Sequence, residues 1–141
     1  MTRGDEAEIA QQIAALQAID AGPVAPSEAQ WRRHLERPAD EAFVVINLLT
    51  LADAAELNRY AETAVPMVQA LGAELIYMGQ ATAVMIGEEV DGCDVVSIWR
   101  WPSRVAWTQL WSNPDYAQIR PHFNRGVQRY RCIESRPLRE A

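Results

Sequence analysis

The chain has 141 residues, 49% of them hydrophobic and 23% charged, which predicts a soluble globular protein with one core. No apolar run approaches the roughly 20 residues that span a bilayer, and the start of the chain lacks the apolar centre of a signal peptide, so we expect a cytoplasmic protein. The net charge of −6, in which all 13 basic residues are Arg, disfavours binding to nucleic acid or to an anionic membrane.

Residues 1–40 predict an N-terminal helical extension. Residues 5–20 carry apolar side chains at helical spacing, and a second short helix begins at Ser27, with Gln30 in the capping-box position, and ends before Pro38. The apolar side chains of the two helices are Ile9, Ile13, Leu16, Ile19, Trp31 and Leu35. They must dock either on the domain that follows or on another subunit, and we expect the extension to pack across a dimer.

Residues 41–141 predict the main domain, which opens with a strand over 43–51 that is apolar on both faces. A helix capped by Asp53 follows, and Pro66 predicts a kink or a break in it near Ala64. Beyond this helix, two short strands over 73–78 and 81–86 are expected to form a hairpin.

The tryptophan-rich part of the chain begins with a strand over 95–101. Pro102 ends this strand, and Ser103 caps the helix that follows. Asn113 and Pro114 begin a second, short helix. A last strand over 127–135 completes the domain.

This order of strands and helices predicts an α+β fold, a ferredoxin-like sandwich with helices on one face of an antiparallel sheet. The strands are nevertheless apolar on both faces, so the second face needs a cover as well. A second copy of the same sheet, related by a two-fold axis, is the simplest cover, and we therefore expect a homodimer that forms a dimeric α/β barrel.

Two further features concern charge and thiols. Cys93 and Cys132 are isolated in sequence, which predicts two unpaired thiols and neither a disulfide nor a metal site. From Arg120 to Arg139 there are six Arg against Glu134 alone. This basic region is either simply solvated, or it meets an acidic surface of a partner subunit or an anionic ligand.

The chain resembles the domain-of-unknown-function family 1330, within the superfamily of dimeric α/β barrels, from Ala42 to Pro137. The first strand, "VPMVQALGAELIYMG" and above all "WPSRVAWTQLWSNPDYAQIRPHF" carry the resemblance. It implies the barrel fold, but no chemistry is established for the family as a whole. Enzymes of the wider superfamily, among them cofactor-independent monooxygenases and isomerases, place their pocket between sheet and helices, which implies a small apolar or aromatic ligand here.

Asn47 and His122 are the candidate catalytic residues. Asn47 interrupts an apolar strand, where a buried amide either finds partners in the core or orients a ligand. His122 is the candidate general base, or alternatively an ordinary surface histidine near a helix end. Haem-degrading relatives also place an Asn on the first strand, but at the position of their histidine this chain has Arg120, so we expect no cofactor.

The candidate ligand-binding residues are aromatic side chains that can wall an apolar pocket and polar ones that can reach a carbonyl or enolate. They are Tyr77, Trp99, Arg100, Trp101, Trp107, Tyr116 and Arg120, with His122 or Arg120 at the mouth of the pocket. Each also has an ordinary role in packing or in a dimer contact.

The motifs of common enzyme classes are missing, and so is any pattern of metal ligands. The sequence therefore favours a small-molecule-binding protein, with cofactor-independent oxygenation or isomerisation of an aromatic or enolisable substrate as the chemistry if it is an enzyme. The alternative is a non-catalytic dimeric protein, structural or stress-related, without a ligand.

Overall fold

The computed structural model describes residues 3–20, 22 and 24–138. Along these residues, five α-helices and four strands follow one another, with a single 3-10 turn in a loop. In chain order they are α1 (Arg3–Ile19), α2 (Glu28–Leu35), β1 (Phe43–Leu51), α3 (Ala54–Ala70), β2 (Glu74–Gln80), the 3-10 turn η1 (Glu89–Asp91), β3 (Val95–Trp101), α4 (Arg104–Ser112), α5 (Pro114–Gly126) and β4 (Val127–Ser135).

The four strands form one antiparallel sheet in the order β2-β3-β1-β4. With helices between β1 and β2 and between β3 and β4, this is the ferredoxin-like arrangement that the sequence predicts. The expected bounds of β1, β3 and β4 are confirmed. In the register of the sheet, Asn47 on the central strand β1 lies between Ser97 of β3 and Cys132 of β4.

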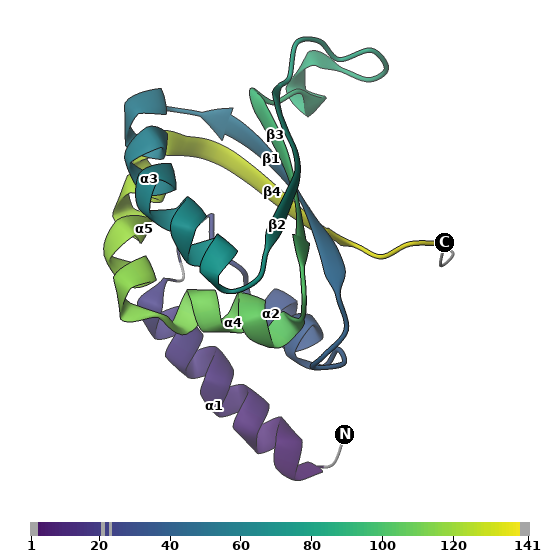
Figure 1. Ribbon diagram of the computed structural model, residues 1–141, viewed down its shortest axis with the longest axis vertical. Helices are drawn as coiled ribbons and strands as arrows, with labels where there is room; N and C mark the ends of the chain where they lie inside the picture. Colours follow the sequence, from purple (N-terminus) through teal and green to yellow (C-terminus); the bar gives the residue numbers. More distant parts are fainter. Residues whose placement is uncertain (1–2, 21, 23, 139–141) are drawn as a thin grey trace.

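The helices α3, α4 and α5 cover one face of the sheet (Figure 1). Each begins at the capping residue that the sequence indicates, because a short polar side chain there accepts from free backbone N–H groups. Asp53 accepts from the N–H groups of Ala55 and Glu56, Ser103 from that of Ala106, and Asn113 from that of Asp115.

The predicted hairpin over 73–86 is wrong. Only β2 forms, and its partner is β3, so residues 81–94 become the loop that joins these two strands. Asp94 closes the loop, since its carbonyl accepts from the N–H of Ala81 and its carboxylate from the N–H of Leu51. Met85 and Ile86, which the prediction placed in a strand, are almost fully exposed.

The two prolines that lie inside helices, Pro66 and Pro121, do not break them. Pro66 lies within α3, which runs without interruption past Ala64, and α5 continues beyond Pro121 to Gly126 instead of ending as a short helix. A proline removes one backbone donor. Packing of α3 against α5 outweighs that loss, with the ring of Tyr60 4.9 Å from the ring of Phe123.

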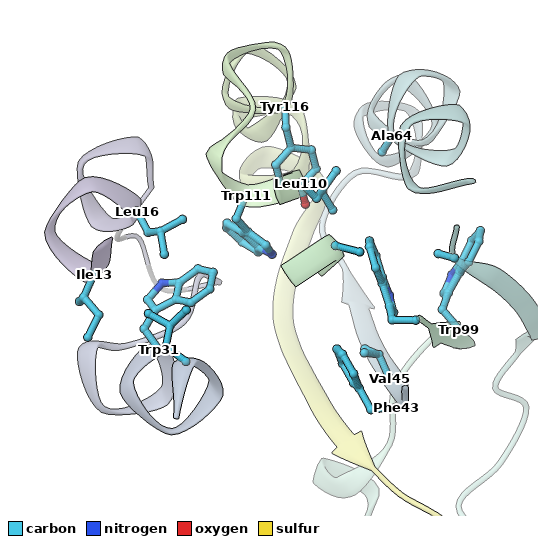
Figure 2. Packing of buried hydrophobic residues seen from close by; sticks show 14 of the residues in the cluster. Ile13, Leu16, Trp31, Phe43, Val45, Ala64, Trp99, Leu110, Trp111 and Tyr116 are labelled. Atoms are coloured by element: carbon cyan, nitrogen blue, oxygen red, sulfur yellow. The ribbon is translucent and has the colours of Figure 1, made fainter. Parts of the chain in front are cut away.

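The N-terminal extension docks on its own chain. Ile13 and Leu16 of α1 lie on one side of Trp31, and Trp111 of α4 lies on the other (Figure 2). Trp31 is fully buried, with its ring centroid 5.7 Å from that of Trp111. The apolar stripes of α1 and α2 are therefore part of the core of the main domain, and the expected packing of the extension across a dimer is not needed to bury them.

The opposite face of the sheet has no helix over it in the described part of the chain (Figure 1). The side chains that point to this face from the central strands are mainly aliphatic, among them Ile46 and Ile98, with Arg100 at one end. Ile133 of the edge strand β4 lies on the same face and is 48% exposed. The centre of this face is thus apolar, as the sequence predicts.

At Gly126, α5 lies very close to the backbone of α3. A Cβ atom there would lie 2.7 Å from the backbone nitrogen of Leu57. We expect Gly126→Ala to lower the free energy of unfolding by about 1–3 kcal/mol, since the two backbones must separate to make room. Urea denaturation measures this change, with Gln118→Ala on the exposed side of α5 as the control. Equal stability of the two variants would contradict the tight contact.

Candidate functional site

A cavity of about 310 Å³ lies between the sheet and the helices α3, α4 and α5. We call it the inner cavity. Its wall is mainly apolar, and it includes Val45, Leu49, Ala61, Ala64, Val68, Trp99, Trp101, Trp107, Leu110, Trp111 and Phe123. Such a wall, with a few polar groups set into it, is typical of a site for a small organic molecule.

Three polar side chains of neighbouring strands meet at the sheet side of this cavity. The amide nitrogen of Asn47 donates to the hydroxyl of Ser97 at 3.1 Å, and the hydroxyl of Tyr130 donates to the amide oxygen of Asn47 at 2.6 Å. Burial raises the pKa of Tyr130 well above its ordinary value, so the phenol stays protonated and keeps donating. The trio is neutral and largely satisfied by its own members.

A second polar pair lies on the helix side of the cavity. The hydroxyls of Tyr60 on α3 and Tyr116 on α5 are 2.6 Å apart. Burial raises the pKa of Tyr60 well above its ordinary value and raises that of Tyr116 as well. Both phenols are therefore neutral near pH 7, and together they can offer a ligand one donor and one acceptor.

Arg120 is the only cationic side chain in the described wall of the inner cavity. It is 2% exposed, and its guanidinium carbon lies 4.5 Å from the ring centroids of both Trp111 and Phe123. Its Nε donates to the carboxylate of Asp20 at 2.8 Å, and its Nη2 donates to the carbonyl of Val24 at 3.1 Å. The charge of Arg120 is thus neutralised by the extension, and the side chain does not lie at a pocket mouth.

The carboxyl group of Asp20 is held in its ionised form. Burial alone would raise its pKa, but the N–H of Gly22 and the guanidinium of Arg120 donate to the carboxylate, and together they lower the pKa below its usual value.

The structure brings six of the nine candidate residues to the inner cavity. These are Asn47, Trp99, Trp101, Trp107, Tyr116 and Arg120. Tyr77 is 54% exposed on the edge strand β2, where it pairs with Ile98 on the uncovered face of the sheet. Arg100 is also exposed, and neither of these two lines the cavity.

His122 lies away from the cavity, on the outer side of α5. Its Nδ1 is 2.6 Å from the carboxylate of Glu56, which also contacts the guanidinium groups of Arg59 and Arg125. Hydrogen bonding from His122 is the main cause that lowers the pKa of Glu56. This cluster ties α3 to α5, and the geometry gives His122 no contact with a molecule in the inner cavity.

The sequence reasoning missed Tyr60, Tyr130, Ser97 and Asp20 as members of the site. Ser97 shares a strand face with Trp99 and Trp101, so the alternation of side chains along β3 already predicted that Ser97 points to the same side of the sheet as these two rings. The position of Asp20 could also have predicted its role, because a carboxylate just after the C-terminus of a helix is unfavourable unless it has a specific partner. Tyr60 and Tyr130 carry no such local signal.

The described residues contain neither a metal site nor a membrane-spanning helix. They contain no group of three or more His, Cys, Asp or Glu side chains that could hold a metal ion. Within the same residues, no helix has the length and apolarity to cross a membrane.

The fold and the cavity define an α+β protein of ferredoxin-like topology with a mainly apolar cavity between sheet and helices. The family model of a domain of unknown function, DUF1330, matches residues 41–133, about two-thirds of the chain. The chain therefore belongs to this family. No protein with a curated description matches it.

Among solved structures, the chain is similar to a protein of unknown function from Rhodopseudomonas palustris, at 22% identity and a TM-score of 0.78, over 85% of this chain and 100% of that one. A nipsnap family protein of unknown function from Agrobacterium tumefaciens shares 16% identity at a TM-score of 0.50, over 72% of this chain and 93% of that one. A dabb family protein with a ferredoxin-like fold from Mesorhizobium loti shares 18% sequence identity at a TM-score of 0.48, over 69% of this chain and 97% of that one. The first of these likenesses shows the fold alone.

The buried ion pair gives the first prediction for the site. We expect Asp20→Asn to lower the free energy of unfolding by about 3 kcal/mol, since the charge of Arg120 is left buried without a counterion. Urea denaturation at pH 7 measures this loss, and Glu62→Gln, at an exposed position of α3, is the control. A loss no larger than that of the control would contradict a structural role for the pair.

The same pair predicts a dependence on pH. Because the pKa of Asp20 is lower in the folded chain than in the unfolded chain, its contribution is present above the unfolded value of 3.8 and is lost as the pH falls through the folded value. The difference in stability between the wild type and Asp20→Asn should therefore shrink below about pH 4. A constant difference across this range would contradict the assignment.

Proposed function

We propose that this protein binds a small, largely apolar molecule in the inner cavity. The observation that carries the proposal is the convergence of Asn47, Ser97 and Tyr130, one side chain from each of three adjacent strands, on an otherwise apolar wall. Such a combination gives a ligand both contact area and a fixed orientation.

The lining and the size point to an aromatic ligand. A volume of about 310 Å³ is at the lower end for small-molecule sites. The indole rings of Trp99, Trp101 and Trp107 offer faces and edges for ring contacts. The second amide hydrogen of Asn47 and the hydroxyl of Ser97 remain available to a carbonyl or hydroxyl group of the ligand.

Binding is proposed rather than catalysis. Cofactor-independent oxygenation or isomerisation of an enolisable compound needs a group that removes a proton at neutral pH. Among the described residues that line the cavity there is no Asp, Glu or His, and the tyrosines have raised pKa values. The polar groups of this site suit the recognition of a ligand better than proton abstraction.

We further propose that the protein is a homodimer, in which two sheets pack through their uncovered faces. Ile46, Ile98 and Ile133 give this face an apolar centre, and a monomer would leave it in contact with water. A two-fold axis would bring the same side chains of both copies together and complete a barrel of the dimeric α/β kind.

Ligand binding is tested with 2-naphthol, which combines an aromatic body with one hydroxyl. We expect saturable binding by titration calorimetry, and at 100 times the dissociation constant a gain in stability of about 2.7 kcal/mol. Asn47→Leu should weaken binding about tenfold through the lost hydrogen bond. Tyr77→Ala is the control, since Tyr77 lies outside the cavity. Absence of saturable binding, or an equal effect of the two variants, would contradict the proposal.

The dimer is tested by light scattering during gel filtration. We expect a dimeric mass for the wild type and a monomeric mass for Ile98→Asp, because the new carboxylate would have to be buried between the two sheets. Val105→Asp, at an exposed apolar position of α4, should leave the mass unchanged. A monomeric wild type, or dissociation by both variants, would sink this idea.

A further inference from the structure

A second cavity, of about 590 Å³, lies between the extension and the main domain. We call it the outer cavity. One side is formed by α2 and the segment before it, and the other by β4, the start of β1 and α4. The extension thus does more than cover the core, because it supplies one wall of a hollow that the main domain alone would leave open.

The outer cavity differs from the inner one in charge. Its described lining holds three arginines, Arg33, Arg37 and Arg131, against the single carboxylate of Glu134, an excess of two positive charges. Arg37 contacts Glu134 at 2.7 Å, and Arg131 donates to the carbonyl of Asp91. Arg33 is exposed and forms no ion pair or hydrogen bond with the described residues. In a protein of net charge −6, this is a local basic site.

His34, in the same wall, also indicates that the local electrostatic potential is positive. Burial is the main cause that lowers its pKa to about 4, and the positive charges of Arg104, Arg37 and Arg136 lower it further. The imidazole is therefore neutral at pH 7. Its ring centroid lies 4.7 Å from that of Trp107, so the neutral ring extends the aromatic surface of the cavity.

The two cavities adjoin. Val45, Trp107, Trp111 and Tyr130 line both of them, and within this shared wall Trp107 and Tyr130 are only partly buried. The inner cavity has no uncompensated charge, because Arg120 is paired with Asp20. An uncharged, apolar group is therefore suited to the inner cavity, and a negative charge to the outer one.

From this division we propose that the molecule bound by this protein is an aromatic acid, with its ring system in the inner cavity and its anionic group in the outer cavity beside Arg33. The inference rests on the proposed function and names the class of ligand. It also gives the extension a functional role, since Arg33 belongs to residues 1–40.

The extension is fixed firmly enough to form a binding wall. Arg104 of α4 donates through its Nε to the carbonyl of Arg37 at 2.6 Å. The hydroxyl of Thr108 lies 3.3 Å from the Nε2 of His34. With the Asp20–Arg120 pair and the buried ring of Trp31, these contacts hold both ends of α2 against the main domain.

Two dyes that share one skeleton test the proposal. 8-Anilinonaphthalene-1-sulfonate carries a sulfonate, whereas N-phenyl-1-naphthylamine is the same molecule without it, and both fluoresce when they leave water. We expect the full-length protein to bind the sulfonate about tenfold more tightly, as a charge-assisted hydrogen bond would give. Arg33→Gln should remove this preference and leave the affinity for the neutral dye unchanged.

Arg32→Gln is the matched control, since Arg32 is the neighbouring arginine of α2, pairs with Glu28 and does not line the outer cavity. Asn47→Leu should weaken both dyes, because it removes the amide oxygen of Asn47, whose second lone pair can accept from the amine N–H that both dyes carry. Equal affinity of the wild type for the two dyes, or an equal effect of Arg33→Gln and Arg32→Gln, would overturn the inference. If Asn47→Leu still weakened the neutral dye, the proposed function would stand. Absence of saturable binding by either dye would overturn both.

Discussion

The ion pair between Asp20 and Arg120 is the interaction on which the rest of the structure depends. Both side chains are almost fully buried, and the guanidinium lies between Trp111 and Phe123. A buried charge is costly unless it is paired and hydrogen-bonded. The pair therefore fixes where the extension meets α5, and it makes Arg120 an electrically neutral part of the cavity wall.

The tryptophans provide the apolar contacts that attach the extension to the main domain. Trp31 of the extension contacts Trp107 and Trp111 of α4, with ring centroids 5.2 and 5.7 Å apart. Trp107 and Trp111 also line both the inner cavity and the outer one. Aromatic side chains suit such a position, because each buries a large area while keeping a defined ring geometry. This cluster of tryptophans thus attaches the extension to the main domain and forms part of the wall of both the inner and the outer cavity.

The sheet has one face for the core and another for a partner in the arrangement we propose. On the inner face, Asn47 finds its partners in Ser97 and Tyr130 because the register of three strands aligns them. On the other face, aliphatic side chains have no cover in the described part of the chain. Ligand binding and dimerisation would therefore use opposite faces of the same strands, so each can be altered by mutation without touching the other.

The sequence by itself determined the bounds of β1, β3 and β4 and the helix caps, and it indicated the ferredoxin-like topology. It could do so because alternating apolar residues, capping side chains and a proline at the first helical position act over a few neighbouring positions. It also pointed to Asn47 and to most of the aromatic wall. Only the tertiary structure decided that Pro66 and Pro121 stay inside helices and that β2 pairs with β3. Only the tertiary structure shows that His122 lies outside the inner cavity and that Asp20 pairs with Arg120, which is 100 positions away in the chain. These outcomes depend on packing between distant segments, which no local pattern records.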